Sequence, residues 1–190
     1  FTVPATGPSA TVSPSTATTD ASGVASITAT ANGTAGAYEV TASIPGATGT
    51  FALTNIAGPA TAIAATGGTP QSAAVNAPFT NALQVTVHDA GNNPVSGVTV
   101  TFAVPGSGAS ASPSSTTATT NASGVASITA TANGTVGAYE ATASIPGASA
   151  TFVLTNTAGA AAAIATSGGT PQSVPVNTQF ATALQVTVRD

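Results

Sequence analysis

The sequence has no cysteine, no methionine and no tryptophan, and only 3% of its 190 residues are charged. Secreted domains shorter than about 80 residues usually need disulfides to stay folded. The absence of cysteine therefore predicts modules large enough to bury a hydrophobic core, for which the 42% hydrophobic content supplies the material. Lysine is absent too, so a lysine–asparagine isopeptide cross-link is chemically impossible within this stretch.

Positive charge is almost missing. Arg189 is the only Lys or Arg, against five acidic residues, and the net charge is −4. Binding to nucleic acid or to an anionic membrane surface requires clustered Lys and Arg, so the sequence argues against both partners. The longest apolar stretch, 158–165, is far shorter than the roughly 20 residues of a membrane span, and no membrane insertion is expected. Thr, Ser and Asn take the place of charge, which favours a location outside the cell.

A repeat covers the whole chain. Shifting the sequence by 101 positions aligns 1–89 with 102–190 without a gap. Of the 89 aligned pairs, 26 differ and the remaining 63 are identical. The stretch GVASITATANGT occurs unchanged at 23–34 and at 124–135. Solenoid repeats have periods of about 20–50 residues, whereas a period near 100 matches one independently folding domain. The repeat therefore predicts tandem domains.

Apolar and polar residues alternate with a period of two over most of the chain. In LQVTVHD, for example, Leu83, Val85 and Val87 point to one side and the residues between them to the other. This pattern indicates strands with one buried and one Thr-rich, solvated face. About seven short strands in roughly 100 residues predict an all-β, immunoglobulin-like sandwich. We expect the strands near 62–75, 79–89, 95–105, 115–120, 125–132, 138–145 and 150–156.

Two local features carry finer expectations. Tyr38 and Tyr139 stand early in the expected sixth strand, where they form either a tyrosine corner or an ordinary core contact. Within the repeated twelve-residue stretch, Val24 and Ile27 are three residues apart, so we expect a bulge or a late strand start there.

Three segments together strongly resemble the bacterial Ig-like group 1 repeats: LQVTVHDAGNNPVSGVTVTF, TTNASGVASITATA and GAYEATASI. Such repeats form the stalks of invasin- and intimin-type adhesins and of other large bacterial surface proteins. The resemblance implies a β-sandwich, stacking of modules end to end, and a role as a spacer or fibre outside the cell. It assigns no receptor-binding residue, because no terminal receptor-binding domain is present in these residues.

The repeat places the expected domain boundaries. We expect one complete module over 57–157, a partial module with the last five strands over 1–56, and a partial module with the first two strands over 158–190. The linkers are only a few residues long, so neighbouring modules should touch. The end pieces are complementary, which fits a window cut from a longer fibre. Subunits joined by donated strands are the alternative.

The acidic residues are too scattered for catalysis. Asp89 and Asp190 end equivalent strands, where we expect them to cap turns. A calcium ligand is the alternative, although calcium needs six to eight oxygens and usually several carboxylates. Glu39 and Glu140 face outward and are too isolated to form an acid–base pair.

His88 is the only histidine, and Arg189 occupies its position in the next repeat. A nucleophilic Ser or Thr needs a base, and a single His cannot supply a triad in every repeat. We therefore predict no catalytic residue, no cofactor, no metal and no enzyme activity.

Three N-x-S/T motifs are possible sites of N-glycosylation: Asn32, Asn121 and Asn133. The alternative is that these asparagines only form turns beside Gly or Ala.

The sequence thus favours a non-enzymatic structural repeat of a long extracellular bacterial surface protein, acting as an adhesin stalk or filament. Its expected partners are neighbouring modules of the same chain and identical chains in a filament. A glycan-binding module is an alternative, but it needs exposed aromatic rings, and the Phe and Tyr residues fall at inward positions.

Overall fold

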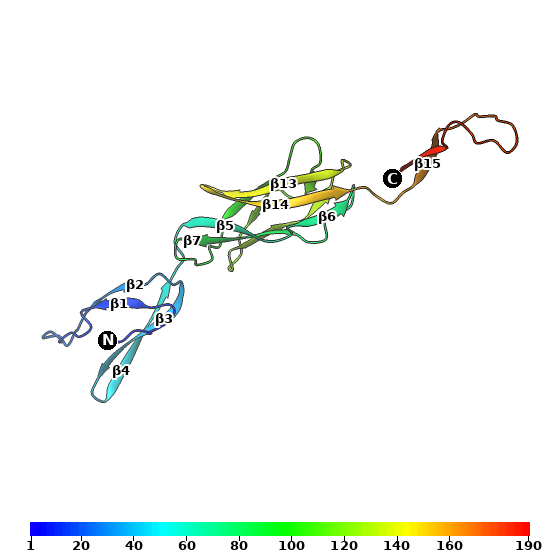
Figure 1. Ribbon diagram of the computed structural model, residues 1–190. Coiled ribbons are helices and arrows are strands. Elements are labelled where there is room, and N and C mark those ends of the chain that lie inside the picture. The colour runs from blue at the N-terminus through cyan, green and yellow to red at the C-terminus, as the bar shows by residue number, and fades with distance from the viewer.

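The computed structural model describes Phe1–Asp190 and contains sixteen β-strands and no helix. It therefore has no helix that could cross a membrane. An N-terminal segment, a central module and a C-terminal hairpin follow one another along an elongated molecule (Figure 1). The two termini lie in different segments, on either side of the central module.

The central module is a sandwich of two sheets. The larger sheet has the order β10-β8-β13-β14-β6 and the smaller one β11-β7-β5, and β12 pairs separately with β9. The pairs are antiparallel except for β6, which runs parallel to β14. The strands of the module are β5 (Ala60–Gly67), β6 (Gln71–Ala74), β7 (Leu83–Asp89), β8 (Thr99–Ala103), β9 (Ala111–Pro113), β10 (Thr117–Thr119), β11 (Val125–Ile128), β12 (Ala130–Ala132), β13 (Gly137–Ile145) and β14 (Ala148–Thr157).

The period-two pattern decides which side chains form the core. Buried and half-buried residues alternate strictly along β7, as the sequence predicts. The rings of Phe102 and Phe152 lie 6.3 Å apart between the sheets, and both belong to a cluster of sixteen buried apolar residues. Threonines such as Thr99 and Thr101 occupy the exposed positions of β8. The all-β, immunoglobulin-like fold expected from the sequence is confirmed.

The expected first strand, 62–75, is divided between the sheets. β5 pairs with β7 in the smaller sheet, and β6 pairs with β14 in the larger one. The chain changes sheets at Gly68, whose φ is +77° and where a Cβ atom would lie 2.3 Å from the carbonyl oxygen of Ala82. Only glycine fits such a position. β9 was not expected from the sequence, because it has only three residues and ends in a proline.

In the central module neither a bulge nor a late strand start occurs over Val125–Ile128, so that expectation is wrong there, although the strand is interrupted at Thr129 between β11 and β12. β11 pairs with β7 without any shift of register, because the inward positions are Ala126, Ile128, Ala130 and Ala132, while Val125 is only half-buried. In the N-terminal copy the strand does start late, at Thr28.

The tyrosine corner is also not formed. The hydroxyl of Tyr139 is buried but has no hydrogen-bond partner, whereas a tyrosine corner requires a hydrogen bond from that hydroxyl to the backbone. Burial raises the pKa of Tyr139. Tyr139 is therefore an ordinary contact at the edge of the core.

The N-terminal segment and the C-terminal hairpin repeat parts of this module. The segment has β1 (Ala10–Ser13), β2 (Thr28–Ala31), β3 (Gly36–Ile44) and β4 (Ala47–Asn55), and the hairpin has β15 (Ala163–Gly168) and β16 (Gln185–Arg189). β3 and β4 pair in the same register as β13 and β14, shifted by 101 residues.

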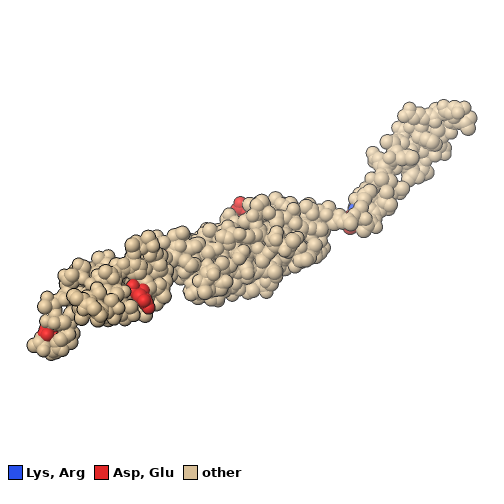
Figure 2. All heavy atoms as spheres, turned by 90° about the horizontal axis from the view of Figure 1, so that it is seen from below, with Lys and Arg blue, Asp and Glu red and all other residues tan.

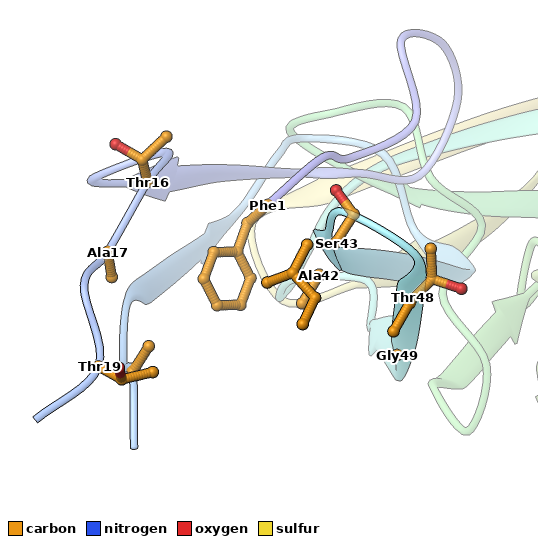
Figure 3. A pocket seen from close by; sticks show the side chains of 11 residues that line it. Phe1, Thr16, Ala17, Thr19, Ala42, Ser43, Thr48 and Gly49 are labelled. Atoms are coloured by element: carbon orange, nitrogen blue, oxygen red, sulfur yellow. The ribbon is translucent and has the colours of Figure 1, made fainter. Parts of the chain in front are cut away.

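The N-terminal segment has no strands equivalent to β5 and β7, so one face of it is open. Phe51 is 52% exposed there, whereas its counterpart Phe152 is 0% exposed. A cavity of about 430 Å³ opens beside the Phe1 side chain. Figure 3 shows the Phe1 ring between the loop that carries Thr16 and Thr19 and the Ala42–Ser43 end of β3.

Candidate functional site: the junction between successive modules

The charged residues do not converge on a catalytic centre. No group of three or more His, Asp or Glu side chains that could hold a metal ion is present. His88 is half-buried on β7, and Glu39 and Glu140 are exposed on β3 and β13. Figure 2 shows the visible acidic side chains as small, scattered spots on a face that is mostly uncharged.

The most highly connected polar group is Asp89, at the end of β7, with only 8% of its surface exposed. Its Oδ1 accepts hydrogen bonds from the backbone N–H groups of Gly91 (2.9 Å) and Asn93 (2.8 Å). Its Oδ2 accepts one from the N–H of Gly58, 2.7 Å away in the linker. The expectation that Asp89 caps a turn is confirmed, and the same carboxylate also holds the linker.

The side chain of Asn93 completes this arrangement. Its Nδ2 donates to both oxygens of Asp89, at 3.1 and 3.0 Å. These bonds from Asn93, together with those from Gly58 and Gly91, lower the pKa of Asp89 from its ordinary value of 3.8 to about 2, because each of them favours the charged carboxylate. A carboxylate with so many donors already bound is a structural anchor, and the calcium alternative has no further carboxylate beside it.

Asn93 also reaches the preceding module. Its Oδ1 accepts a hydrogen bond from the N–H of Ala35 (2.9 Å), and its Nδ2 donates to the carbonyl of Gly33 (2.9 Å). Gly91 lies so close to this turn that a Cβ atom on it would be 2.7 Å from the Gly33 oxygen. We call Asp89, Asn93, Gly58, Gly33 and Ala35 the junction cluster.

Part of the cluster recurs at the next junction. Asp190, the repeat counterpart of Asp89, directly follows β16. Its Oδ2 accepts a hydrogen bond of 2.7 Å from the N–H of Gly159, the counterpart of Gly58. The cap expected for Asp190 is thus seen as a bond to the linker. The repeat therefore preserves the bond between carboxylate and linker.

Each module has a buried asparagine, Asn55 or its repeat counterpart Asn156, that supports the turn at the end of the repeated stretch, and Asn93 contacts the turn that Asn55 supports. In the central module Asn156 is 0% exposed, and its Nδ2 donates to the carbonyl of Ser110 (2.9 Å), to Oδ1 of Asn133 (2.9 Å) and to the carbonyl of Thr135 (3.1 Å). In the N-terminal segment Asn55 makes the same three kinds of bond, at 2.9, 3.0 and 3.1 Å.

The possible glycosylation sites differ in their surroundings. The Nδ2 of Asn133 donates to the carbonyl of Gly108 at 2.8 Å, and that of Asn32 donates to Gly7 at 2.8 Å. Asn121 is exposed. Its Oδ1 accepts from the N–H groups of Ser123 and Val125, while its Nδ2 makes no hydrogen bond. Glycosylation at these three sites stays a prediction.

Sequence reasoning missed the roles of Asn93, Asn55 and Asn156. Asn93 stands in an Asn-Asn pair within an ordinary turn. Such a pair indicates a turn but does not reveal a hydrogen-bond partner about sixty residues away. Asn55 and Asn156 lie at the same repeat position near the ends of β4 and β14, and nothing in the sequence indicated that they are buried.

Two facing sheets with this strand order define an immunoglobulin-like sandwich. The chain belongs to the bacterial Ig-like domain family (group 1), whose model matches residues 63–158, just over half of the chain. No curated protein matches it in sequence.

Three solved structures resemble the chain at low sequence identity. The Escherichia coli adhesin FdeC superposes with a TM-score of 0.59 at 18% identity, over 87% of this chain and 57% of the FdeC chain. The D0-D1 domain of intimin gives a TM-score of 0.38 at 24% identity, over 80% of this chain and 75% of that one. Domains 4-9 of the surface layer protein SbsC give 0.41 at 18% identity, over 87% and 25%. The likeness to FdeC shows a common fold, and this chain spans little more than half of that adhesin structure.

Proposed function

We propose that this chain is a non-enzymatic structural part of a long bacterial surface protein, in which Ig-like modules are joined in series outside the cell. The module boundaries in this proposal are 1–56, 57–157 and 158–190. Membership of the bacterial Ig-like family supports it, as does the fold shared with an adhesin. The sparse charge and the Thr-rich exposed faces agree with an extracellular location.

The observation that carries the proposal is the junction between modules. The linker after β4 is short, and Gly58 within it donates to Asp89 of the following module. The preceding module makes two hydrogen bonds of its own to Asn93. Because the modules contact each other directly, they extend the chain as a rod. With ten residues in β14, each module adds about 33 Å at 3.3 Å per residue.

The absence of catalysis is part of the same proposal. A general base must lie within hydrogen-bond reach of the group it deprotonates. His88, the only histidine, makes no side-chain hydrogen bond, and its repeat counterpart is Arg189. The acidic residue with the most partners, Asp89, has its oxygens occupied by N–H donors.

The shape of the protein in solution tests the proposal. Small-angle X-ray scattering of the chain should give the profile of an extended rod. A matched variant with a flexible Gly-Ser insertion between Ile56 and Ala57 should give a broader distribution of shapes. A wild-type profile as broad as that of the insertion variant would contradict a stiff series of modules.

Association through donated strands is a second candidate, favoured by the exposed apolar residues at both ends. Phe51 and Val186 are 52% and 56% exposed, whereas their repeat counterparts, Phe152 and Val85, are fully buried together in the central module. The C-terminal hairpin of one copy would then cover the open face of the next, as in strand addition. Such a head-to-tail contact does not close on itself and gives linear assemblies.

Sedimentation velocity over a range of concentrations tests this second candidate. Donated strands predict oligomers that grow with concentration and are lost in Val186→Asp. The control Thr187→Asp changes the other face of the same strand and should leave the oligomers intact. A single species of one chain at every concentration would reject strand donation and leave the rod proposal standing.

The glycan-binding alternative finds little support. A sugar platform requires exposed aromatic rings, and in the central module Phe79, Phe102 and Phe152 are all buried. The exposed rings, Phe51 and Phe180, are repeat counterparts of two of these buried residues.

A further inference from the structure

We infer that Asp89 and Asn93 fix the orientation of a module relative to the one before it, so that the junction cluster sets the direction of the rod at each step. This inference rests on the proposed function, because it concerns modules that act in series. It assigns a positioning role to two residues of the turn that follows β7, Asp89–Val95, and names the partner they recognise, which is the backbone of the preceding module's turn around Asn32–Ala35.

The geometry at Asn93 restricts rotation as well as separation. Its carboxamide accepts from the N–H of Ala35 and donates to the carbonyl of Gly33, both at 2.9 Å. A carboxamide is planar and carries its donor and acceptor at fixed relative positions. Two bonds of opposite sense to one turn therefore define an angle between the modules, which a single bond would leave free.

Asp89 holds Asn93 in the orientation that this pairing needs. The carboxylate accepts from the backbone N–H of Asn93 at 2.8 Å and from its Nδ2 at 3.1 and 3.0 Å. It also accepts from Gly58 in the linker at 2.7 Å. Hydrogen bonds to an ionised acceptor are stronger than those between neutral groups. One side chain thus ties together the turn, the bridging amide and the linker.

The receiving side of the junction consists only of backbone groups. Because Gly33 and Ala35 contribute a carbonyl and an N–H, the side chain at position 35 is free to vary, and the repeat has Val136 there. The shape of the turn is set from inside the preceding module, where Asn32 Oδ1 accepts from the N–H of Thr34 at 3.1 Å. The central module presents the same turn, since Asn133 Oδ1 accepts from Thr135 at 3.1 Å.

The receiving turn thus recurs in each module. The other side of the junction is the short turn of the next module that carries Asp89 and Asn93. A turn of this shape followed by a module with Asp89 and Asn93 is all that the junction requires. The orientation of one module on the next is therefore independent of most surface side chains.

Distance distributions across the junction test the inference. The chain has no cysteine, so Thr30→Cys in β2 and Thr119→Cys in β10 would carry the only two spin labels. Double electron–electron resonance on the wild-type background should give one narrow distance distribution. Asn93→Ala should broaden it severalfold, and Asn93→Asp should broaden it too, because the donor to Gly33 is lost and a second carboxylate faces Asp89.

Asn92→Gly is the matched control. Asn92 lies in the same turn with a φ of 62°, which glycine adopts readily, and its side chain makes no hydrogen bond. This variant should keep the narrow distribution. Asp89→Asn, which removes the charge but keeps the shape, should broaden the distribution less than Asn93→Ala does.

A second variant approaches the same contact without changing any side chain that forms hydrogen bonds. Gly91→Ala would place a Cβ atom 2.7 Å from the Gly33 carbonyl, so it should shift the mean distance or broaden the distribution. A pair of labels within the central module should report an unchanged distance in this variant, because Gly91 lies outside that module's core.

The outcomes separate this inference from the proposed function. If Asn93→Ala and Gly91→Ala both leave the width and the mean of the distance distribution as in the wild type, the junction cluster does not set the orientation, and the rod proposal is unaffected. If the wild-type distribution is already as broad as that of a chain with a flexible Gly-Ser insertion, both the inference and the stiff rod are wrong.

Discussion

Replacing Asn156 with alanine should strongly destabilise the central module. The Asn156 side chain is fully buried, and the two hydrogens of its Nδ2 are shared among three acceptors at 2.9, 2.9 and 3.1 Å, while its buried Oδ1 has no hydrogen-bond partner. A buried hydrogen bond contributes roughly 1 kcal/mol net to stability, so losing the two that Nδ2 can supply should lower the free energy of unfolding by about 2 kcal/mol. For a domain whose total stability is roughly 5–15 kcal/mol, this is a large fraction.

Intrinsic tyrosine fluorescence offers a direct assay. The chain has two tyrosines and no tryptophan, so Tyr38→Phe leaves Tyr139 as the only reporter, and it lies in the central module. Urea denaturation of this background with and without Asn156→Ala gives the difference in unfolding free energy, provided that the slope with denaturant is unchanged.

A matched control and a double-mutant cycle make the test specific. Asn92→Gly changes an exposed asparagine and should alter stability by less than about 0.5 kcal/mol. Asn133→Ala removes one of the three acceptors that share Nδ2, so its effect and that of Asn156→Ala should not add. A loss below about 1 kcal/mol for Asn156→Ala would mean that the hydrogen bonds of Nδ2 together contribute less than one ordinary bond, and the reasoning would be refuted.

Further predictions use the repeat and the junction. Phe152→Ala should cost about 3–5 kcal/mol, whereas Phe51→Ala, the same change at a 52% exposed position, should cost far less in parallel denaturation experiments; equal losses would contradict the open face. The pKa of Asp89 is lowered to about 2, so its contribution to the junction should be fully present above about pH 4 and be lost as the pH falls through about 2. The loss should appear as a broader distribution of distances between the two spin labels. Asp89→Asn should abolish this pH-dependent transition. In a host that modifies N-x-S/T sites, intact mass and peptide mapping should find sugar on Asn121, whose Nδ2 makes no hydrogen bond, and not on Asn133, whose Nδ2 is engaged. Sugar on Asn133 in place of Asn121 would contradict this reasoning.

Much of the fold could be predicted because its signals are local. Alternation along Leu83–Asp89 depends only on the two-residue period of a strand, and it predicts β7 with its buried face. The turn-capping role of Asp89 follows in the same way from an aspartate beside a Gly-Asn-Asn-Pro turn. The 101-residue repeat required nothing but comparison of the chain with itself.

The errors arose where a residue's environment depends on distant partners. The division of the first strand between β5 and β6 depends on how closely Gly68 approaches Ala82. The expected bulge near Val125 ignored the alanines that continue the inward face. Tyr139 lacks the hydrogen bond of a tyrosine corner because no backbone acceptor lies within reach of its hydroxyl, and the position of a tyrosine in a strand does not specify its acceptor.

The sequence by itself determined the immunoglobulin-like fold, the 101-residue repeat and many of the residues that face the core, because strand periodicity and internal repetition can be read along the chain without any knowledge of spatial contacts. Its resemblance to the bacterial Ig-like repeats indicated the family. Only the tertiary structure decided how one module meets the next. Asn93 acquires its role from Gly33 and Ala35, which lie about sixty residues earlier and in another module. Hydrogen bonds between groups so far apart in sequence exist only after both turns have been folded and brought together, so no local pattern announces them.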